Sequence, residues 1–405
     1  MKILLANKFL YRRAGAEVYV LDLARALERA GHQVAFFAMK DSRNIQTPWS
    51  KYFVDEIHYD RSDGLLEDVR KVGHMIWSVE AAKKFRALLA DFKPDVVHLH
   101  NIYHHLSPSI VQEAKRAGIP VVQTLHDFKL ICPNYRLFTK GSACERCQVM
   151  KYWNAVRYQC LNDSTPASAA VALEMWVHRL LRVYENGVDQ FIAPSVFLRD
   201  LLLRWGKSPA KMIVINNPIE LAAYGGTSTL GEEVVFAGRL AEEKGVWPLL
   251  LAAEKLPDIP FLLIGDGPEL ANIEARIRER KLGNVKLTGF LRGTELTDRL
   301  RKARLIVIPS VWYENYPYAA LEAAALGKAV VASRIGGIPE IVEDGTTGRL
   351  FPPGDVPAMV DAVKNLYQNV GLLEQMGEAA REKVRRENDP QDHLVAVLDI
   401  YKQVS

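Results

Sequence analysis

Two glutamates, Glu314 and Glu322, stand eight residues apart on either side of Pro317. Proline fixes φ and has no amide donor, which suits the first turn of a helix, so a helix is predicted to begin after Pro317. The free N–H groups at its start, those of Tyr318 and Ala319, can hold a phosphate. Carboxylates accept paired hydrogen bonds from vicinal sugar hydroxyls. The pair could therefore hold two sugar rings on either side of a diphosphate; the alternative is two ordinary surface glutamates.

A second stretch, FAGRLAEEKG at residues 236–245, carries cations at a predicted strand-to-helix turn. Gly238 permits a tight backbone there, and Arg239 and Lys244 bracket the turn. Arginine acts as a fork and lysine as a point charge, so the two beside a helix start make a diphosphate site. In the alternative interpretation, Arg239 pairs with Glu242 or Glu243 and binds no ligand.

Histidines gather in the segments VVHLHN and QTLHDF. His98 and His100 share one face of a predicted strand, and core packing is the expected role of His98. His100 and Asn101 fit either a structural role or a place beside the acceptor. His126 ends its strand at the edge where ligands bind. Asp127 follows it directly, so on an ideal strand its side chain points the other way.

These residues need a scaffold, and the sequence predicts an α/β one. Short apolar runs alternate with amphipathic helices in both halves of the chain, which indicates parallel, doubly wound sheets. Such sheets bind ligands at their carboxyl edge, where every motif above falls. We expect a first domain over 1–215, a linker over 216–231 and a second domain over 232–386. A final helix over 387–405 is expected to pack back on the first domain.

The bulk composition is that of a globular protein, with 49% hydrophobic and 25% charged residues among 405. The sequence has no run of about 18 uncharged apolar residues, and its first residues read as a strand, not a signal peptide. A cytoplasmic location is expected. Residues 1–205 hold 28 Lys and Arg against 21 Asp and Glu. This basic half, with an amphipathic stretch at 69–86, fits peripheral contact with anionic lipid; random surface variation and core packing are the alternatives.

Four segments, in order, resemble those of the retaining glycosyltransferases of family 4: AGAE, TLH, GRLAEEKG and the Glu-x7-Glu element ENYPYAALE. The resemblance spans nearly the whole chain. It implies the GT-B architecture, in which two Rossmann-like domains face each other across a cleft. The domain over 1–215 would bind the acceptor, and the domain over 232–386 would bind the nucleotide sugar. There are two departures. Ala14 replaces the first glycine of a Gly-Gly turn, and NYPY follows Glu314 where many members have a GFGL-like sequence.

The resemblance also implies roles for single residues. Glu322 would bind the ribose hydroxyls of the nucleotide, and Glu314 would contact the transferred sugar. Arg239 and Lys244 would neutralise the departing diphosphate, and His126 would help to hold the sugar. The other positions expected on the donor side are Gly15, Gly238, Gly265, Gly267, Phe290 and Leu291, together with the backbone amides of Asn315 and Tyr316.

The implied activity is retaining transfer of a sugar from a UDP or GDP sugar to a hydroxyl of a glycan or lipid-linked glycan, with an α-linkage. The sequence has no Asp-x-Asp pair, the element with which other glycosyltransferases hold a divalent metal, so no catalytic metal is expected. Aromatic residues interleaved with basic ones are not evident, and a nucleic-acid partner is not expected. The alternatives are a nucleotide-sugar 2-epimerase of the same architecture and a zinc-bearing binding protein on an inactive scaffold.

All four cysteines, Cys132, Cys144, Cys147 and Cys160, fall within one stretch. Clustering of every cysteine in a cytosolic protein favours a shared ligand, and Zn²⁺ held by four thiolates is the usual one. We therefore expect a cysteine-rich insertion over 130–162 with structural zinc, which would mark a subgroup of the family. Four free thiols, or a redox pair at Cys144 and Cys147, are the alternatives. The insertion leaves the strand that ends in His126, so it should shape the acceptor pocket.

Overall fold

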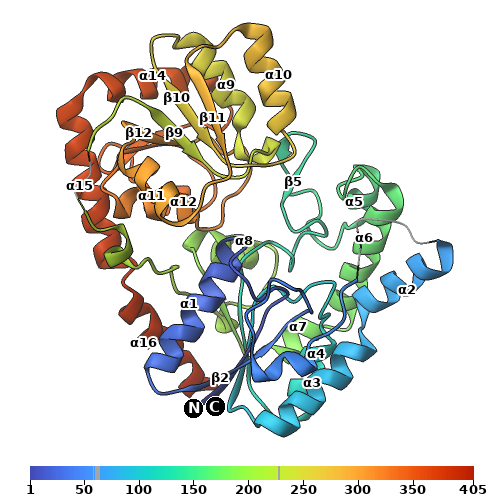
Figure 1. The fold of residues 1–405 in the computed structure, drawn as a ribbon. Helices are drawn as coiled ribbons and strands as arrows, with labels where there is room; N and C mark the ends of the chain where they lie inside the picture. Colours follow the sequence, from blue (N-terminus) through green and yellow to red (C-terminus); the bar gives the residue numbers. More distant parts are fainter. Residues whose placement is uncertain (58, 60–63, 227–228) are drawn as a thin grey trace.

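The computed structural model describes residues 1–57, 59, 64–226 and 229–405. It has two lobes, each built on a six-stranded parallel sheet with helices packed around it (Figure 1). The predicted fold class, two Rossmann-like α/β domains, is therefore confirmed. Residues 227–228 of the predicted linker lie outside the described residues.

The first sheet has the strand order β2-β1-β3-β4-β7-β8. Its middle strands, such as β3 with the sequence VVHL, are buried along their whole length, as continuous apolar runs in parallel sheets are. The strands are β1 (Lys2–Ala6), β2 (Gln33–Phe37), β3 (Val96–Leu99), β4 (Val121–Thr124), β7 (Gln190–Ala193) and β8 (Met212–Val214). The helices of this domain include α1 (Gly15–Arg29), α2 (Leu65–Ile76), α3 (Val79–Phe92), α4 (Ser109–Arg116) and α8 (Val196–Arg204).

The second sheet has the order β11-β10-β9-β12-β13-β14. Its strands are β9 (Val234–Ala237), β10 (Phe261–Ile264), β11 (Val285–Gly289), β12 (Leu305–Ile308), β13 (Val330–Ser333) and β14 (Gly348–Phe351). Its helices are α9 (Val246–Lys255), α10 (Leu270–Arg280), α11 (Gly293–Arg301), α12 (Tyr318–Ala325), α13 (Ile338–Ile341), α14 (Val356–Gln368) and α15 (Val370–Glu387). Apolar residues from both faces of this sheet form two clusters of buried side chains.

The cysteine-bearing segment and the residues after it form an irregular insertion in the first domain. It contains a two-stranded hairpin of β5 (Phe138–Thr139) and β6 (Ser142–Ala143), followed by α5 (Trp153–Arg157), α6 (Thr165–Leu180) and α7 (Val183–Gly187). Figure 1 shows β5 beside the second domain. The hydroxyl of Tyr313, in the second domain, donates a hydrogen bond to Glu145 of the insertion at 2.8 Å. The insertion therefore touches both domains.

The last helix, α16 (Pro390–Val404), lies against the first domain, next to α1 (Figure 1). Its apolar residues Leu394, Val397 and Ile400 join the cluster that contains Ile3 and Leu5 of β1. The ring of His98 makes hydrogen bonds with Tyr401 of this helix at 2.6 Å and with Thr124 at 2.8 Å. The expected core role of His98 matches these contacts. The chain thus passes between the domains twice.

The amphipathic stretch at 69–86 is divided between two helices. Trp77 has an extended backbone after α2, and the side chain of Ser78 caps the start of α3. Met75 is buried, as core packing requires, while Val79 is largely exposed. No helix among the described residues is long and apolar enough to cross a bilayer.

Candidate active site

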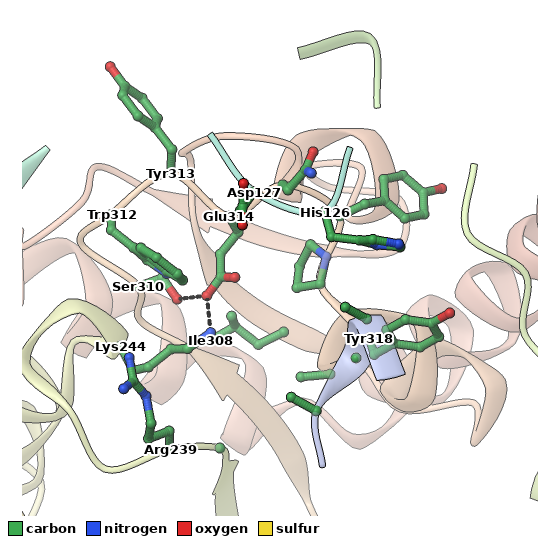
Figure 2. A pocket seen from close by; sticks show the side chains of 18 of the residues that line it. His126, Asp127, Arg239, Lys244, Ile308, Ser310, Trp312, Tyr313, Glu314 and Tyr318 are labelled. Carbon is green, nitrogen blue, oxygen red and sulfur yellow. Dashed lines mark hydrogen bonds and ion pairs between the residues drawn. The ribbon is translucent and has the colours of Figure 1, made fainter. Parts of the chain in front are cut away.

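A cavity of about 490 Å³ lies between the two domains, at the carboxyl edges of both sheets (Figure 2). From the first domain it receives Gly15, Asn101 and His126, which follow β1, β3 and β4. From the second domain it receives residues that follow β9 and β12. The predicted residues that line it are Gly15, Asn101, His126, Gly238, Arg239, Lys244, Glu314, Asn315 and Tyr316. Residues far apart in the sequence thus meet because parallel strands present their ends at one edge.

Glu314 is held at the floor of this cavity, in the loop after β12, with 6% of the residue exposed. Its carboxylate accepts hydrogen bonds from the hydroxyl of Ser310 at 2.7 Å and from the ammonium group of Lys244 at 2.8 Å (Figure 2). Burial by itself would raise the pKa of Glu314, but Lys244 and then Ser310 bring it below its ordinary value. Glu314 is therefore ionised at neutral pH.

Both predicted cations already have a carboxylate partner. Arg239 forms an ion pair with Glu243, as one of the two sequence interpretations anticipated, and its side chain remains 47% exposed at the cavity. Lys244 pairs with Glu314 and lies 5.0 Å from the centre of the Trp312 ring. Because both side chains line the cavity, each could exchange its carboxylate partner for an anion bound there.

The residues of the unusual NYPY segment tie the glutamate loop to other parts of the chain. The side chain of Asn315 donates to the carbonyl of Leu125 in the first domain at 2.9 Å. The hydroxyl of Tyr316 accepts hydrogen bonds from Asn216 at 2.9 Å and from Asn388 at 3.0 Å. Both asparagines lie where the chain crosses between the domains. Asn315 and Tyr316, where this chain departs from the family sequence, thus anchor the loop that carries Glu314. The sequence did not suggest this role.

Glu322 does not line the cavity of Glu314. It lies on α12 in a second, neighbouring cavity of about 640 Å³, where it accepts a hydrogen bond from the hydroxyl of Tyr224 at 3.2 Å. Desolvation raises its pKa. Tyr318 lines both cavities, and its ring would be 3.0 Å from a Cβ placed on Gly15. The two glutamates are thus separated by an aromatic ring that packs on a glycine.

His126 lines the smaller cavity, and its Nε2 is 3.1 Å from the Nδ1 of His100. Desolvation lowers the pKa of His126 to about 3, so this ring is neutral at pH 7. His100 is fully buried and does not line the cavity; it contacts His126, which does. This favours the structural side of the alternative stated for His100, while Asn101 does line the cavity.

Asp127 lines the same cavity as His126, whereas an ideal strand would turn it away. The expectation was wrong because β4 ends at Thr124, three residues before Asp127, so the strand alternation of side chains no longer applies there. Its carboxylate accepts from the backbone N–H of Lys129 at 2.9 Å. Desolvation raises the pKa of Asp127 to about 6.

The other predicted donor positions are outside both cavities. Gly265 has φ +146°, and a Cβ there would be 1.9 Å from the carbonyl oxygen of Gly238. A Cβ on Gly267 would similarly meet the carbonyl of Leu240, so both glycines permit close backbone contact. Phe290 is 67% exposed, and Leu291 packs on the second domain. Their contact with a nucleotide stays a prediction.

The four cysteines line one small pocket in the insertion. None of the four forms a disulfide bond, and burial raises the pKa of Cys132 to about 12. Within the described ranges, no three Cys, His, Asp or Glu side chains are grouped so as to hold a metal ion. The structural zinc therefore stays a prediction.

Two residues of the insertion, Tyr135 and Arg136, also line the smaller cavity. Sequence reasoning gave no role to either. The signal that could have found them is their position between Cys132 and Cys144, in a segment expected to shape the acceptor pocket.

A family model described as Glycosyltransferase Family 4 matches residues 13–223, more than half of the chain. The chain belongs to glycosyltransferase family 4. A second model, Glycosyl transferases group 1, matches residues 227–383 of the transferase. The α-maltose-1-phosphate synthase of Mycolicibacterium smegmatis is 30% identical to it over 340 residues, which cover 76% of this chain and 79% of that protein. A 42.6 kDa protein in the cps region of Klebsiella pneumoniae is 28% identical and covers 84% of this chain and 87% of its own.

Solved structures agree with the fold. The sucrose-phosphate synthase of Thermosynechococcus elongatus has a TM-score of 0.73 at 20% identity, covering 99% of this chain and 98% of that one. HepE from Anabaena, in complex with UDP-glucose, has a TM-score of 0.71 at 17% identity over the whole of both chains. The transferase therefore has the GT-B architecture. The family models and the curated relatives, not these structures, make it a hexosyltransferase.

Proposed function

We propose that this transferase moves a sugar from a nucleoside diphosphate, UDP or GDP, to a hydroxyl of a glycan or lipid-linked glycan, with retention of the α-configuration and without a catalytic metal. One observation carries the proposal. The ionised, buried Glu314, two cations and the start of α12 line the same cavity as His126 and Gly15 of the opposite domain. That set provides partners for a sugar and for a diphosphate in one cavity between the domains.

The donor would span both cavities. Glu322 would bind the ribose in the larger cavity, and the base would lie by the start of α11, near Phe290 and Leu291. The free N–H groups at the start of α12, with Arg239 and Lys244, would hold the diphosphate. Because Tyr318 stands between the two cavities, its ring must move aside when a donor bridges them.

In the reaction, the acceptor oxygen would attack the anomeric carbon from the face that the diphosphate leaves. The bond from that carbon to the β-phosphate oxygen breaks, and the proton of the acceptor hydroxyl passes to this departing oxygen. Glu314 would orient the sugar, together with the backbone amides of Asn315 and Tyr316. A neutral His126 can donate a hydrogen bond to the sugar without adding charge. The cations would stabilise the negative charge that develops on the leaving group.

The relatives support the choice of substrates. Anabaena HepE forms complexes with UDP and with UDP-glucose, and glycogen synthase of Mycobacterium tuberculosis is 27% identical over 95% of this chain. We therefore assign the donor to the second domain and the acceptor to the first, and expect a role in polysaccharide synthesis. A cytoplasmic site of action follows from that donor, with peripheral membrane contact through the basic first half if the acceptor is lipid-linked.

A transfer assay tests the proposal. UDP, GDP and ADP sugars are first compared by thermal shift, and the stabilising donor is then incubated with glycan acceptors in EDTA. We expect an α-linked product by NMR. Glu322→Gln should weaken nucleotide binding, and Glu314→Gln should mainly lower kcat. Glu378→Gln, at an exposed position of α15, is the matched control and should change neither. Loss of activity in EDTA with an intact fold would contradict the metal-independent reaction, and an epimer formed without acceptor would indicate the epimerase.

For the cysteine pocket, we propose a structural zinc ion. Four thiols from one insertion line a single pocket, and zinc prefers four thiolates when its role is structural. Binding would draw the sulfur atoms together and release protons. Elemental analysis of purified protein should find about one zinc per chain, and Cys147→Ser should lose it. Four thiols that react with a thiol reagent in native protein without zinc would support the free-thiol alternative.

A further inference from the structure

Arg136, in the insertion of the first domain, lines the same smaller cavity as the cations of the second domain. Those cations are engaged, Arg239 with Glu243 and Lys244 with Glu314. Within the part of the chain that the structure describes, Arg136 forms no ion pair, and its guanidinium lies 5.8 Å from the centre of the Tyr135 ring. It is therefore a cation at the cavity whose charge is not neutralised by the protein itself.

The loop that carries Arg136 is held in an unfavourable backbone conformation. Its two neighbours, Tyr135 and Leu137, have φ of 55° and 49°, in the left-handed region that residues with a Cβ rarely adopt. Such a conformation persists only where the surroundings enforce it, and it is concentrated at sites that bind ligands. Leu137 is buried in the core of the first domain, which fixes one side of the loop.

Asn134 fixes the other side and links the loop to the cysteines. This side chain is 2% exposed. Its oxygen accepts from the backbone N–H of Arg136 at 3.1 Å and from the thiol of Cys132 at 2.9 Å, and its nitrogen donates to the carbonyls of Phe138 and Cys160. A buried amide with all these partners is a rigid support. Asn134 thus connects the backbone of Arg136 to the cysteine pocket.

We propose that Arg136 binds an oxyanion on the acceptor, a phosphate or a carboxylate close to the accepting hydroxyl, and so selects anionic acceptors. The inference rests on the proposed function, in which the donor diphosphate occupies the second domain and the acceptor enters from the first. A guanidinium fork matches either oxyanion through two parallel hydrogen bonds.

The test compares neutral and anionic acceptors in pairs: glucose with glucose 1-phosphate, glucose with glucuronate, and an alkyl glycoside with the same sugar on a lipid diphosphate. In the wild type, kcat/KM should be about 10- to 100-fold higher for an anionic member, the effect of a charge-assisted bidentate contact. Arg136→Gln should abolish the preference, and Arg136→Lys should keep part of it. Lys151→Gln, an exposed position in the same insertion, should keep all of it. The pair with the highest ratio identifies the oxyanion.

Two results would overturn the inference: equal rates for all pairs in the wild type, or a preference that survives in Arg136→Gln. If Arg136→Gln instead weakens UDP binding and slows all acceptors alike, the residue serves the donor and the inference is wrong. A titration with glucose 1-phosphate, with and without UDP, separates this inference from the proposed function. Absence of UDP binding would count against the proposed function, whereas phosphate binding that Arg136→Gln leaves unchanged would count against Arg136.

Discussion

Replacement of Lys244 by methionine tests the arrangement at the floor of the cavity. The change removes the ammonium group that lies 2.8 Å from the Glu314 carboxylate and leaves the Ser310 hydroxyl, which donates to this carboxylate at 2.7 Å. Breaking a buried ion pair by removal of one partner costs about 3–5 kcal/mol. Because the Lys244 side chain is 25% exposed, we expect the lower part of that range or somewhat less, about 2–3 kcal/mol.

The pH dependence gives the prediction its sign. In the wild type, the folded pKa of Glu314 is lowered, so the stability it contributes is present above the unfolded pKa and is lost only below about pH 4. In Lys244→Met, the ammonium group no longer offsets the effect of burial on Glu314, so the folded pKa of Glu314 should rise above its unfolded pKa. The variant then loses stability as pH rises through that new pKa. The gap in stability between wild type and variant should therefore widen from pH 5 to pH 8.

Thermal unfolding of the wild type, Lys244→Met, Glu314→Gln and the double variant measures this. A loss of about 2–3 kcal/mol corresponds to a fall in Tm of about 4–12 °C for a domain of this size. The double variant should be more stable than the sum of the single losses predicts, because the glutamine needs no counter-charge. A gap that is the same at pH 5 and pH 8, or single losses that simply add, would refute the reasoning.

Three further variants extend these tests. Gly265→Ala should lower Tm by well over 10 °C or abolish folding of the second domain, because a Cβ would lie 1.9 Å from the Gly238 carbonyl; Gly283→Ala, where a Cβ meets nothing within 4 Å, should fold normally. Asp127 has a folded pKa of about 6, above its unfolded value, so it should make stability fall as pH rises from about 4 to about 6. Asp127→Asn should remove that component from urea unfolding curves. Tyr318→Leu should raise the association rate constant of UDP several-fold in stopped-flow fluorescence, and an unchanged rate would contradict a ring that must move aside.

The sequence predicts the elements around the site because their signals are local. The helix after Pro317 and the strand before Arg239 follow from a few neighbouring residues, and the order of parallel strands brings His126, Lys244 and Glu314 to one cavity. The position of Asp127 could not be predicted, since it depends on where β4 stops pairing. The site of Arg136 depends on left-handed residues in an irregular loop, for which the sequence carries no periodic signal.

The separation of the two glutamates shows the same limit. Spacing along α12 fixes how far Glu322 is from Glu314, but the ring of Tyr318 divides the space between them only because it packs on Gly15 of the other domain. A contact between residues about 300 positions apart has no local signature. For the same reason, the pairing of Arg239 with Glu243 could be stated from the sequence only as one of two alternatives.

The two passages of the chain between the domains lie side by side. The backbone N–H of Ile219 donates to the carbonyl of Asn388, and the side chain of Asn388 donates to the carbonyl of Asn217 and to the hydroxyl of Tyr316. Two chain segments joined by hydrogen bonds act as a hinge: they permit one lobe to rotate relative to the other but resist translation and twisting between the lobes. Tyr316 is hydrogen-bonded to this hinge through Asn388 and is only two residues from Glu314. A rotation of the lobes is therefore transmitted to the loop that carries this carboxylate.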